Sequence, residues 1–340
     1  MKRIVLISMM ALAAAGAWAQ DLADFQGGFE SFATDMAATL SYNATIGNNW
    51  SDAYIGQLPH FGVGLAVGFT AVPAESLEEF FQAALGEALP DSLKKAGLPI
   101  PAAALSAKIG GIILPFDFGI KAMVLPPEAT EAISALGIAA DYKLLGANIR
   151  LGLVKEGLLF PDVSLGAGYN RLMGSVQVPL DVPDQTYNFT AGTPQSLRVS
   201  DPDLQLDWTT DSFDFTLQVS KKVLFFRPFA GLGYSLGTST VGGGLAAKMY
   251  YDSDTGGGPG EQLVTSAEVA AIKQALADAG QPVPDISADG FLFSATNSDP
   301  VLRVYGGLSL NLFFLNLDLQ GIYVPKTKGL GANAMIRVQL

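Results

Sequence analysis

The last forty residues of the chain alternate apolar and polar side chains almost without a break, and this period of two restricts the fold more than any other feature. One face of residues 302–312 carries Leu302, Val304, Leu308, Leu310 and Leu312, and the other carries Arg303, Tyr305, Ser309 and Asn311. The pattern returns at 315–323 and at 334–340. Because successive side chains of a strand point to opposite faces, it predicts three half-buried strands joined by tight turns. Soluble sandwiches alternate in the same way, so the rest of the chain must decide which face meets lipid.

Residues 1–19 are typical of a secretory signal peptide. Lys2 and Arg3 precede an apolar run, and Ala17-Trp18-Ala19 is a small-residue cleavage site. We therefore expect export to the bacterial cell envelope and removal of this segment. The sequence has no other uncharged apolar run of about 18 residues, so it predicts no membrane-spanning helix.

The composition favours a barrel in the outer membrane. Only 15% of the residues are charged, 49% are hydrophobic and 38 are glycine, whereas a soluble domain has about 25% charged residues. Export, low charge and strand patterning together predict a transmembrane β-barrel. With no cysteine the chain has neither disulfides nor thiolate metal sites, and we expect no cofactor and no metal. The net charge of -12 and the absence of basic clusters argue against nucleic acid.

The predicted fold class is all-β, an antiparallel up-and-down barrel of about ten strands (range 8–14). The barrel is expected over residues 40–340, with its first strand at 40–46 and its second at 60–72. An amphipathic helix at 20–39 is predicted either to cap the barrel on the periplasmic side or to plug it. A helical insert is expected at 74–100, and long loops at 179–203 and 238–300.

Connection lengths give the predicted orientation. Short turns at 155–157, 221–222 and 313–314 alternate with longer connections at 125–132, 179–203 and 238–300. Outer-membrane barrels have short periplasmic turns and long outer loops. With both chain ends in the periplasm, this scheme puts the helical insert on the periplasmic side as well.

The inward faces of the predicted strands carry the candidate site. A lysine facing lipid at the bilayer midplane costs about 2–4 kcal/mol, so the charged positions are assigned to the lumen. Glycines recur on the inner face of the strand at 60–72, which leaves space for a plug, a ligand or water. The candidate ligand-binding or lumen-lining residues are His60, Gly62, Gly64, Gly68, Asp117, Lys121, Asn148, Arg150, Asp214, Arg303, Asp318 and Arg337. They either line a pore or form a buried polar network.

One segment matches a catalytic motif. Gly233-Tyr234-Ser235-Leu236-Gly237 has the G-x-S-x-G spacing of a nucleophile elbow, and His60 is the sole histidine. The elbow needs a turn from a strand to a helix, whereas this segment lies within a predicted strand. We therefore expect no enzymatic activity.

Residues 49–64 carry a resemblance to a known family. Their sequence, NWSDAYIGQLPHFGVG, together with the signal peptide, resembles spirochaete (treponemal) outer-membrane proteins described as FadL-like, over about residues 20–75. The resemblance implies a barrel plugged by its N-terminal segment and the transport of hydrophobic substrates such as long-chain fatty acids. The chain lacks the Asn-Pro-Ala hatch motif of FadL-type transporters, so no binding residue is carried over.

The functional expectation is an outer-membrane barrel that admits or transports small hydrophobic molecules of the fatty-acid kind. A general porin for polar solutes and a structural or surface-interaction protein are the alternatives. The expected partners are the lipid bilayer of the outer membrane, a small hydrophobic substrate, and the barrel-assembly machinery during insertion.

Overall fold

A computed structural model describes residues 26–53, 60–85, 88–111, 115–135, 137–179, 184–191, 193–252, 260–278 and 287–340. The predicted signal peptide and the first residues of the predicted helix at 20–39 lie outside the described residues. Among the described helices, none is both long enough and apolar enough to cross a membrane.

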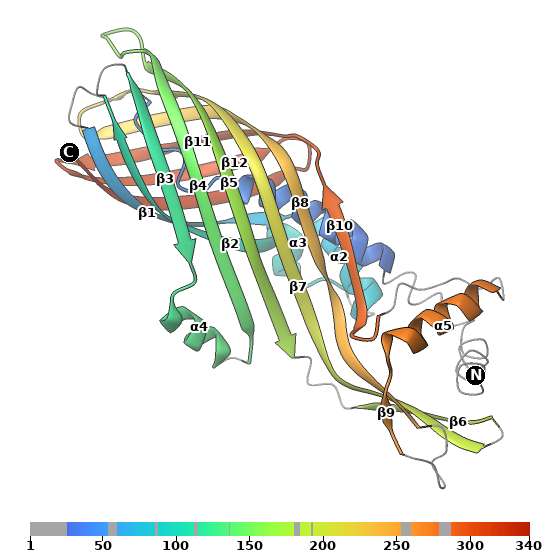
Figure 1. Ribbon diagram of the computed structural model, residues 1–340. Coiled ribbons are helices and arrows are strands. Elements are labelled where there is room, and N and C mark those ends of the chain that lie inside the picture. Colours follow the sequence, from blue (N-terminus) through green and yellow to red (C-terminus); the bar gives the residue numbers. More distant parts are fainter. Residues whose placement is uncertain are drawn as a thin grey trace.

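The wall is a closed antiparallel barrel of ten strands (Figure 1). Each strand pairs with its neighbours along the chain, and β13 pairs with β1 to close the ring. The predicted fold class is therefore confirmed. The wall strands are β1 (His60–Val72), β2 (Leu98–Gly110), β3 (Phe116–Val124), β4 (Ala139–Val154), β5 (Asp162–Pro179), β7 (Thr193–Ser220), β8 (Phe226–Asp252), β11 (Val301–Leu312), β12 (Leu315–Val324) and β13 (Gly329–Gln339).

The remaining elements lie at one end of the barrel. Strands β7 and β8 run far beyond the wall and form an arm with β6 and β9, next to α5 (Figure 1). The bounds are α2 (Ala74–Leu85), α3 (Asp91–Ala96), α4 (Pro127–Ser134), β6 (Gln185–Ala191), β9 (Gln262–Leu263), α5 (Ser266–Asp278) and β10 (Gly290–Asn297). The end that carries α2, α3, α4 and the arm is called here the long-connection end. The opposite end, with the turns at 155–161, 221–225 and 313–314, is the short-turn end.

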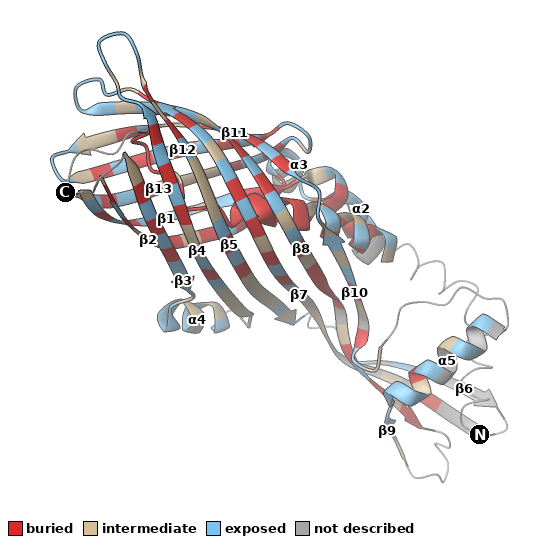
Figure 2. Cartoon of the chain, turned by 45° about the horizontal axis from the view of Figure 1, so that its top comes forward, coloured by how far each residue is buried: buried red, intermediate tan, exposed pale blue. Residues whose placement is uncertain are grey.

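Along the wall strands, exposed residues alternate with buried ones (Figure 2). The exposed side chains of the wall are largely apolar. On β1, for example, Phe61, Leu65 and Phe69 are exposed, whereas Gly62, Gly64 and Ala66 between them are buried. A belt of exposed large apolar side chains around a closed barrel is stable in lipid and costly in water. The alternation therefore places the apolar face toward the membrane.

The helical insert lies at the other end from the one predicted. Val72 pairs with Leu98 at the long-connection end, so α2 and α3 share that end with α4 and the arm. The prediction had counted residues 40–46 as a strand, which reversed the direction of the strand that follows. Without that strand, β1 begins at the short-turn end.

Residues 40–46 do not form the predicted first strand. The helix that includes residues 26–43 continues through residues 40–43 and is followed by turns at 44–47, which are buried inside the barrel. Leu40 and Ala44 fit both patterns, because an apolar pair four apart continues a helical stripe as well as a strand face. The helix forms because Phe29, Phe32 and Met36 extend the apolar face of the helix that Leu40 and Ala44 continue.

Strand β2 was missed, because residues 98–100 were assigned to the helical insert. Pro99 and Pro101 argue against a central strand, since proline cannot donate to the ladder. They are tolerated here because residues 98–104 pair only with β1 among the described strands, and pairing with β3 begins at Leu105. The predicted number of ten strands was therefore reached through two opposite errors.

The two predicted long loops contain strands. Residues 179–203 include β6 and the first part of β7, and residues 238–300 include the last part of β8, then β9, α5 and β10. Pro202 suggested a loop, but the pairing of β7 with β8 shifts register between Ser200 and Asp203, as at a β-bulge. A bulge is one of the few places where a strand accepts proline.

Candidate functional site: a plugged lumen

Residues 26–53, called the plug here, pass through the lumen from the long-connection end to the short-turn end. Near the first end, the Asn43 amide donates to Thr70 Oγ1 at 2.8 Å. Near the second, Arg337 Nη1 donates to Asp52 Oδ1 at 2.6 Å. The plug is largely buried (Figure 2).

The upper part of the lumen, at the long-connection end, is apolar. Rings of the plug stack there with rings from other elements: Phe32 lies 5.2 Å from Phe80 of α2, and Phe29 lies 5.9 Å from Phe293 of β10. Inward side chains from four more strands complete this apolar chamber, namely Leu144, Leu172, Trp208 and Val241. The plug helix is held in it by burial and aromatic packing, which are weakly directional.

The lower part of the lumen is polar, and wall lysines bind the plug backbone there. Lys121 Nζ donates to the carbonyls of Ala44 at 2.5 Å and Ile46 at 2.8 Å. Lys108 Nζ donates to the Asn48 carbonyl at 2.7 Å. The helix of the plug ends at this level, and the backbone carbonyls that follow have no partner within the helix. The two lysine ammonium groups donate to such carbonyls.

Two arginines hold the lower end of the plug. Arg150 donates to the carbonyls of Trp50 and Asp52 while it pairs with Asp117 of the wall. Arg337 bridges Asp52 of the plug and Asp318 of the wall, the latter at 2.9 Å. Because these pairs are buried, removing one partner leaves an uncompensated charge and typically costs about 3–5 kcal/mol.

A second buried network joins wall strands to one another. Arg303 makes two hydrogen bonds to the Asp214 carboxylate, at 2.6 and 2.7 Å, and a third to Ser235 Oγ. Ser235 of the G-x-S-x-G segment lies in strand β8 and donates to Asp214. This network stiffens the wall without contacting the plug backbone.

Trp50 of the plug fits against a glycine of β1. A Cβ built on Gly62 would lie 2.7 Å from the Trp50 ring, which is closer than real atoms approach. The other β1 glycines face the neighbouring strand, since a Cβ on Gly64 would meet Arg337 and one on Gly68 would meet Asn333. Only Gly62 therefore provides space for the plug.

The fit between plug and wall is tight. Beside Asn43, between the plug and strands β1, β12 and β13, the free volume is about 10 Å³. That volume admits one water molecule at most. The gap beside Asn43 is therefore too small to serve as a passage for solutes.

A seam in the wall lies beside the apolar chamber. Residues 98–104 of β2 have no ladder partner on the β3 side among the described strands. The Tyr142 phenol of β4 spans the seam, accepting from the Ala103 N–H at 3.3 Å and donating to the Ala103 carbonyl at 3.2 Å. Residues 99, 101 and 103 point their backbone groups to the same side of β2, toward the seam. Because proline has no N–H, Pro99 and Pro101 leave no unpaired donor there.

The structure brings most of the candidate residues into these two networks. Asp117, Lys121, Arg150, Asp318 and Arg337 belong to the plug contacts, and Asp214 and Arg303 to the wall network. Asn148 contacts Asn48 of the plug at 3.4 Å. His60 lies at the short-turn end, 3.8 Å from Asp52 and 2.8 Å from Gln339. Among the described residues, no group of His, Cys, Asp or Glu could hold a metal ion.

Sequence reasoning missed Lys108, Gln218 and the polar residues of the plug. Gln218 donates to the Trp50 carbonyl at 2.7 Å. Lys108 is one of the inward residues of the missed strand β2, and the alternation of side chains from Ala102 to Gly110 would have revealed it. The plug residues had no comparable signal, because their partners lie far away in sequence.

No family model and no curated protein sequence matches the chain. Solved outer-membrane barrels are similar at low identity. The outer membrane protease OmpT from Escherichia coli is 8% identical, with 84% of this chain and 98% of that chain covered and a TM-score of 0.33. The transport unit of the autotransporter AIDA-I from Escherichia coli is 10% identical, with 89% and 97% covered and a TM-score of 0.31. LpxR from Salmonella typhimurium is 9% identical, with 82% and 99% covered and a TM-score of 0.27.

Proposed function

We propose that this outer-membrane barrel admits small hydrophobic molecules, of the fatty-acid kind, and that the plug is its gate. The observation that carries the proposal is the apolar chamber at the long-connection end. The chain's own helix fills this chamber with apolar side chains, of which Phe29, Phe32 and Met36 are the main contributors. An apolar molecule of similar bulk replaces such contacts at little cost, because burial is not directional.

The seam supports this proposal. It opens the wall beside the chamber at the level of Ile100 and Ala102, which belong to the chamber lining. A side chain, Tyr142, closes it instead of a backbone ladder. A hydrophobic molecule that enters the chamber thus has a route to the membrane that avoids the polar lower lumen.

A reversible cross-link tests the gate. Asn43 and Thr70 side chains are in hydrogen-bond contact, and the natural chain has no cysteine. In the variant N43C/T70C, oxidation should join the plug to β1 and abolish uptake of a fluorescent fatty acid into vesicles that contain the protein. Reduction should restore the uptake.

The single variants N43C and T70C are the matched controls and should transport under both conditions. Heat-resistant migration on gels establishes that each variant is folded. If the oxidised double variant takes up the fatty acid as fast as the reduced one, the plug is not the gate.

A polar-solute porin is the less favoured alternative, because the plug leaves about 10 Å³ beside Asn43. The arm at the long-connection end supports the other alternative, a role in surface interaction. Arg198 of β7 holds the arm together through Glu261 and Asp184, at 2.7 and 2.6 Å. Its hydrogen bonds hold the pKa of the Glu261 carboxyl below the ordinary value.

A further inference from the structure

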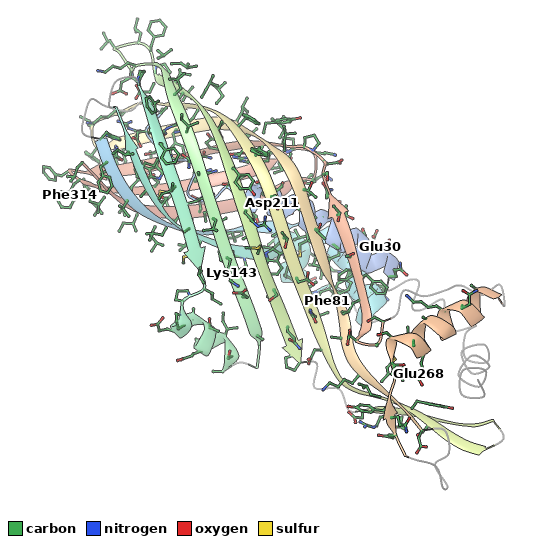
Figure 3. All side chains as sticks on the ribbon, viewed as in Figure 1. Glu30, Phe81, Lys143, Asp211, Glu268 and Phe314 are labelled. Carbon is green, nitrogen blue, oxygen red and sulfur yellow. The ribbon has the colours of Figure 1, made fainter. Side chains whose placement is uncertain are left out.

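The tips of the short turns are apolar and fully exposed. Leu158 is 98% exposed, Leu224 is 80% exposed and Phe313 is 102% exposed. Phe314 extends from the same end beyond the wall (Figure 3). Exposed turn tips in water are normally polar, and contiguous apolar ones indicate an interaction.

Two of these tips have a strained backbone. Leu224 has φ of 57° and Phe313 has φ of 55°, in the left-handed region. Bulky residues are uncommon there, and glycine or asparagine is the usual choice in a hairpin turn. Two separate hairpins therefore keep a large apolar side chain where a small residue would relieve strain.

The tips continue the lipid-facing belt of the wall. Phe226, Leu312 and Val219 are exposed apolar residues that lead up to them on the outer surface. Lys221 Nζ donates to the carbonyls of Phe160 at 3.0 Å and Leu158 at 3.3 Å, which fixes two neighbouring tips to each other. This continuity identifies the membrane leaflet at the short-turn end as the surface that the tips enter.

A polar cavity of about 250 Å³ opens between the apolar tips. Six of its lining residues flank the tips in sequence: Lys155, Glu156 and Asp162 flank the first, Arg227 follows the second, and Asn311 and Asn316 flank the third. The rest of the lining comes from the lumen side, from Asp52 of the plug, His60, Arg337 and Gln339. The cavity therefore has charged groups of both signs inside and an apolar fringe outside. It is smaller than the roughly 300–1,000 Å³ of sites for drug-sized ligands, so it suits one headgroup.

Arg227 has a buried donor without a partner. Its Nε is buried and makes no hydrogen bond, and its Nη1 lies 3.8 Å from Asp162 Oδ2, which is too long for one. Asp162 uses Oδ1 to accept the Glu156 N–H at 2.6 Å. Buried donors in native proteins nearly always have a partner, and a bound water or ion is one explanation for an exception.

We propose that this cavity binds the headgroup of a zwitterionic phospholipid from the surrounding leaflet. The Arg227 guanidinium takes the phosphate, since its planar donors match phosphate oxygens. The carboxylates of Asp162 and Glu156 take the ammonium group, and the apolar tips hold the acyl chains. The site does not overlap the apolar chamber, but it borders the lower end of the plug through Asp52 and its partner Arg337.

Native mass spectrometry of the full barrel in detergent tests the site, with phosphatidylethanolamine as the probe. The natural protein should retain one lipid, and R227Q and D162N should each weaken retention about tenfold or more, as expected for a lost charge-assisted hydrogen bond. K222Q, an exposed lysine on the same rim outside the cavity lining, should retain the lipid normally. Phosphatidylglycerol, which lacks the ammonium group, should bind more weakly.

The tips provide a second measurement that does not depend on the charged variants folding. F313G and L224G relieve backbone strain, so they should preserve or raise thermal stability in detergent while lowering lipid retention. Unchanged retention in R227Q, or equal retention of both lipids, would mean that only annular lipid is bound. Tighter binding of free phosphoethanolamine than of the lipid would assign the cavity to a soluble ligand.

Discussion

Trp50 shows at the scale of one residue how the lumen is closed. Its ring lies 5.0 Å from the Arg337 guanidinium and 5.3 Å from Lys108 Nζ, and its Nε1 donates to Ser106 at 3.4 Å. Cations over an aromatic face attract it most strongly when they are desolvated. A single side chain of the plug therefore joins β1, β2 and β13.

Adding one methyl group at Gly62 should expel this ring. The new Cβ would lie 2.7 Å from Trp50, and the β13 backbone at 3.0 Å leaves no room for retreat. We expect a cost of about 1–3 kcal/mol, typical of overpacking. In a W208F background, G62A should shift the Trp50 emission to longer wavelength.

Gly306 provides the matched control, because a Cβ there would have its nearest neighbour at an ordinary 3.5 Å. G306A should leave the emission unchanged. A spectrum of G62A identical to that of its parent would show that the ring does not occupy the predicted position.

At the scale of an element, strand β2 has the least regular pairing in the wall. Its first half depends on β1 and on the Tyr142 hydroxyl, whereas its second half has ladders on both sides. Backbone groups that lose a buried partner cost about 1–3 kcal/mol each. The seam is therefore expected to open more readily than the rest of the barrel.

Replacing Tyr142 by phenylalanine should loosen the seam without disturbing the wall. Hydrogen exchange in detergent should accelerate at 98–104, because Ala103 loses a donor and an acceptor together, and should stay unchanged at 105–110. Y323F on β12 is the control, since the exposed Tyr323 ring faces lipid. Equal protection of 98–104 in both variants would contradict the role assigned to Tyr142.

The sequence predicted the wall strands correctly where apolar and polar residues alternate regularly. Residues 60–72, 116–124 and 301–340 alternate regularly, and their inward charges were assigned correctly to the lumen side. Strand β2 was hidden by its prolines and small alanines, whose tolerance depends on a missing neighbour. The upper halves of β7 and β8 were hidden because a bulge and a glycine run look like a loop until their partner strands are known.

The plug illustrates a different limit. Its helix followed from a period of three to four, but its position inside the barrel depends on pairs such as Arg337 with Asp52 that are distant in sequence. Amphipathicity states that one face is covered and leaves open what covers it. The helix also runs past the predicted end at residue 39, because Leu40 and Ala44 suit both patterns.

At the scale of the whole molecule, the lumen of the barrel has two parts that hold the plug by different kinds of interaction. The apolar chamber holds the plug through exchangeable contacts, and the polar lower lumen holds it through buried ion pairs and directional hydrogen bonds. A gate of this kind keeps its anchor while its helix yields to an apolar molecule. On this account, residues 26–53 close the lumen of the resting protein.

Current through single barrels in a planar bilayer tests that claim most directly. The intact protein should show little steady ion conductance, and a variant lacking residues 26–53 should show a large and stable one, provided that it still folds into a heat-resistant barrel. A large steady conductance through the intact protein, equal to that of the deletion variant, would contradict the account.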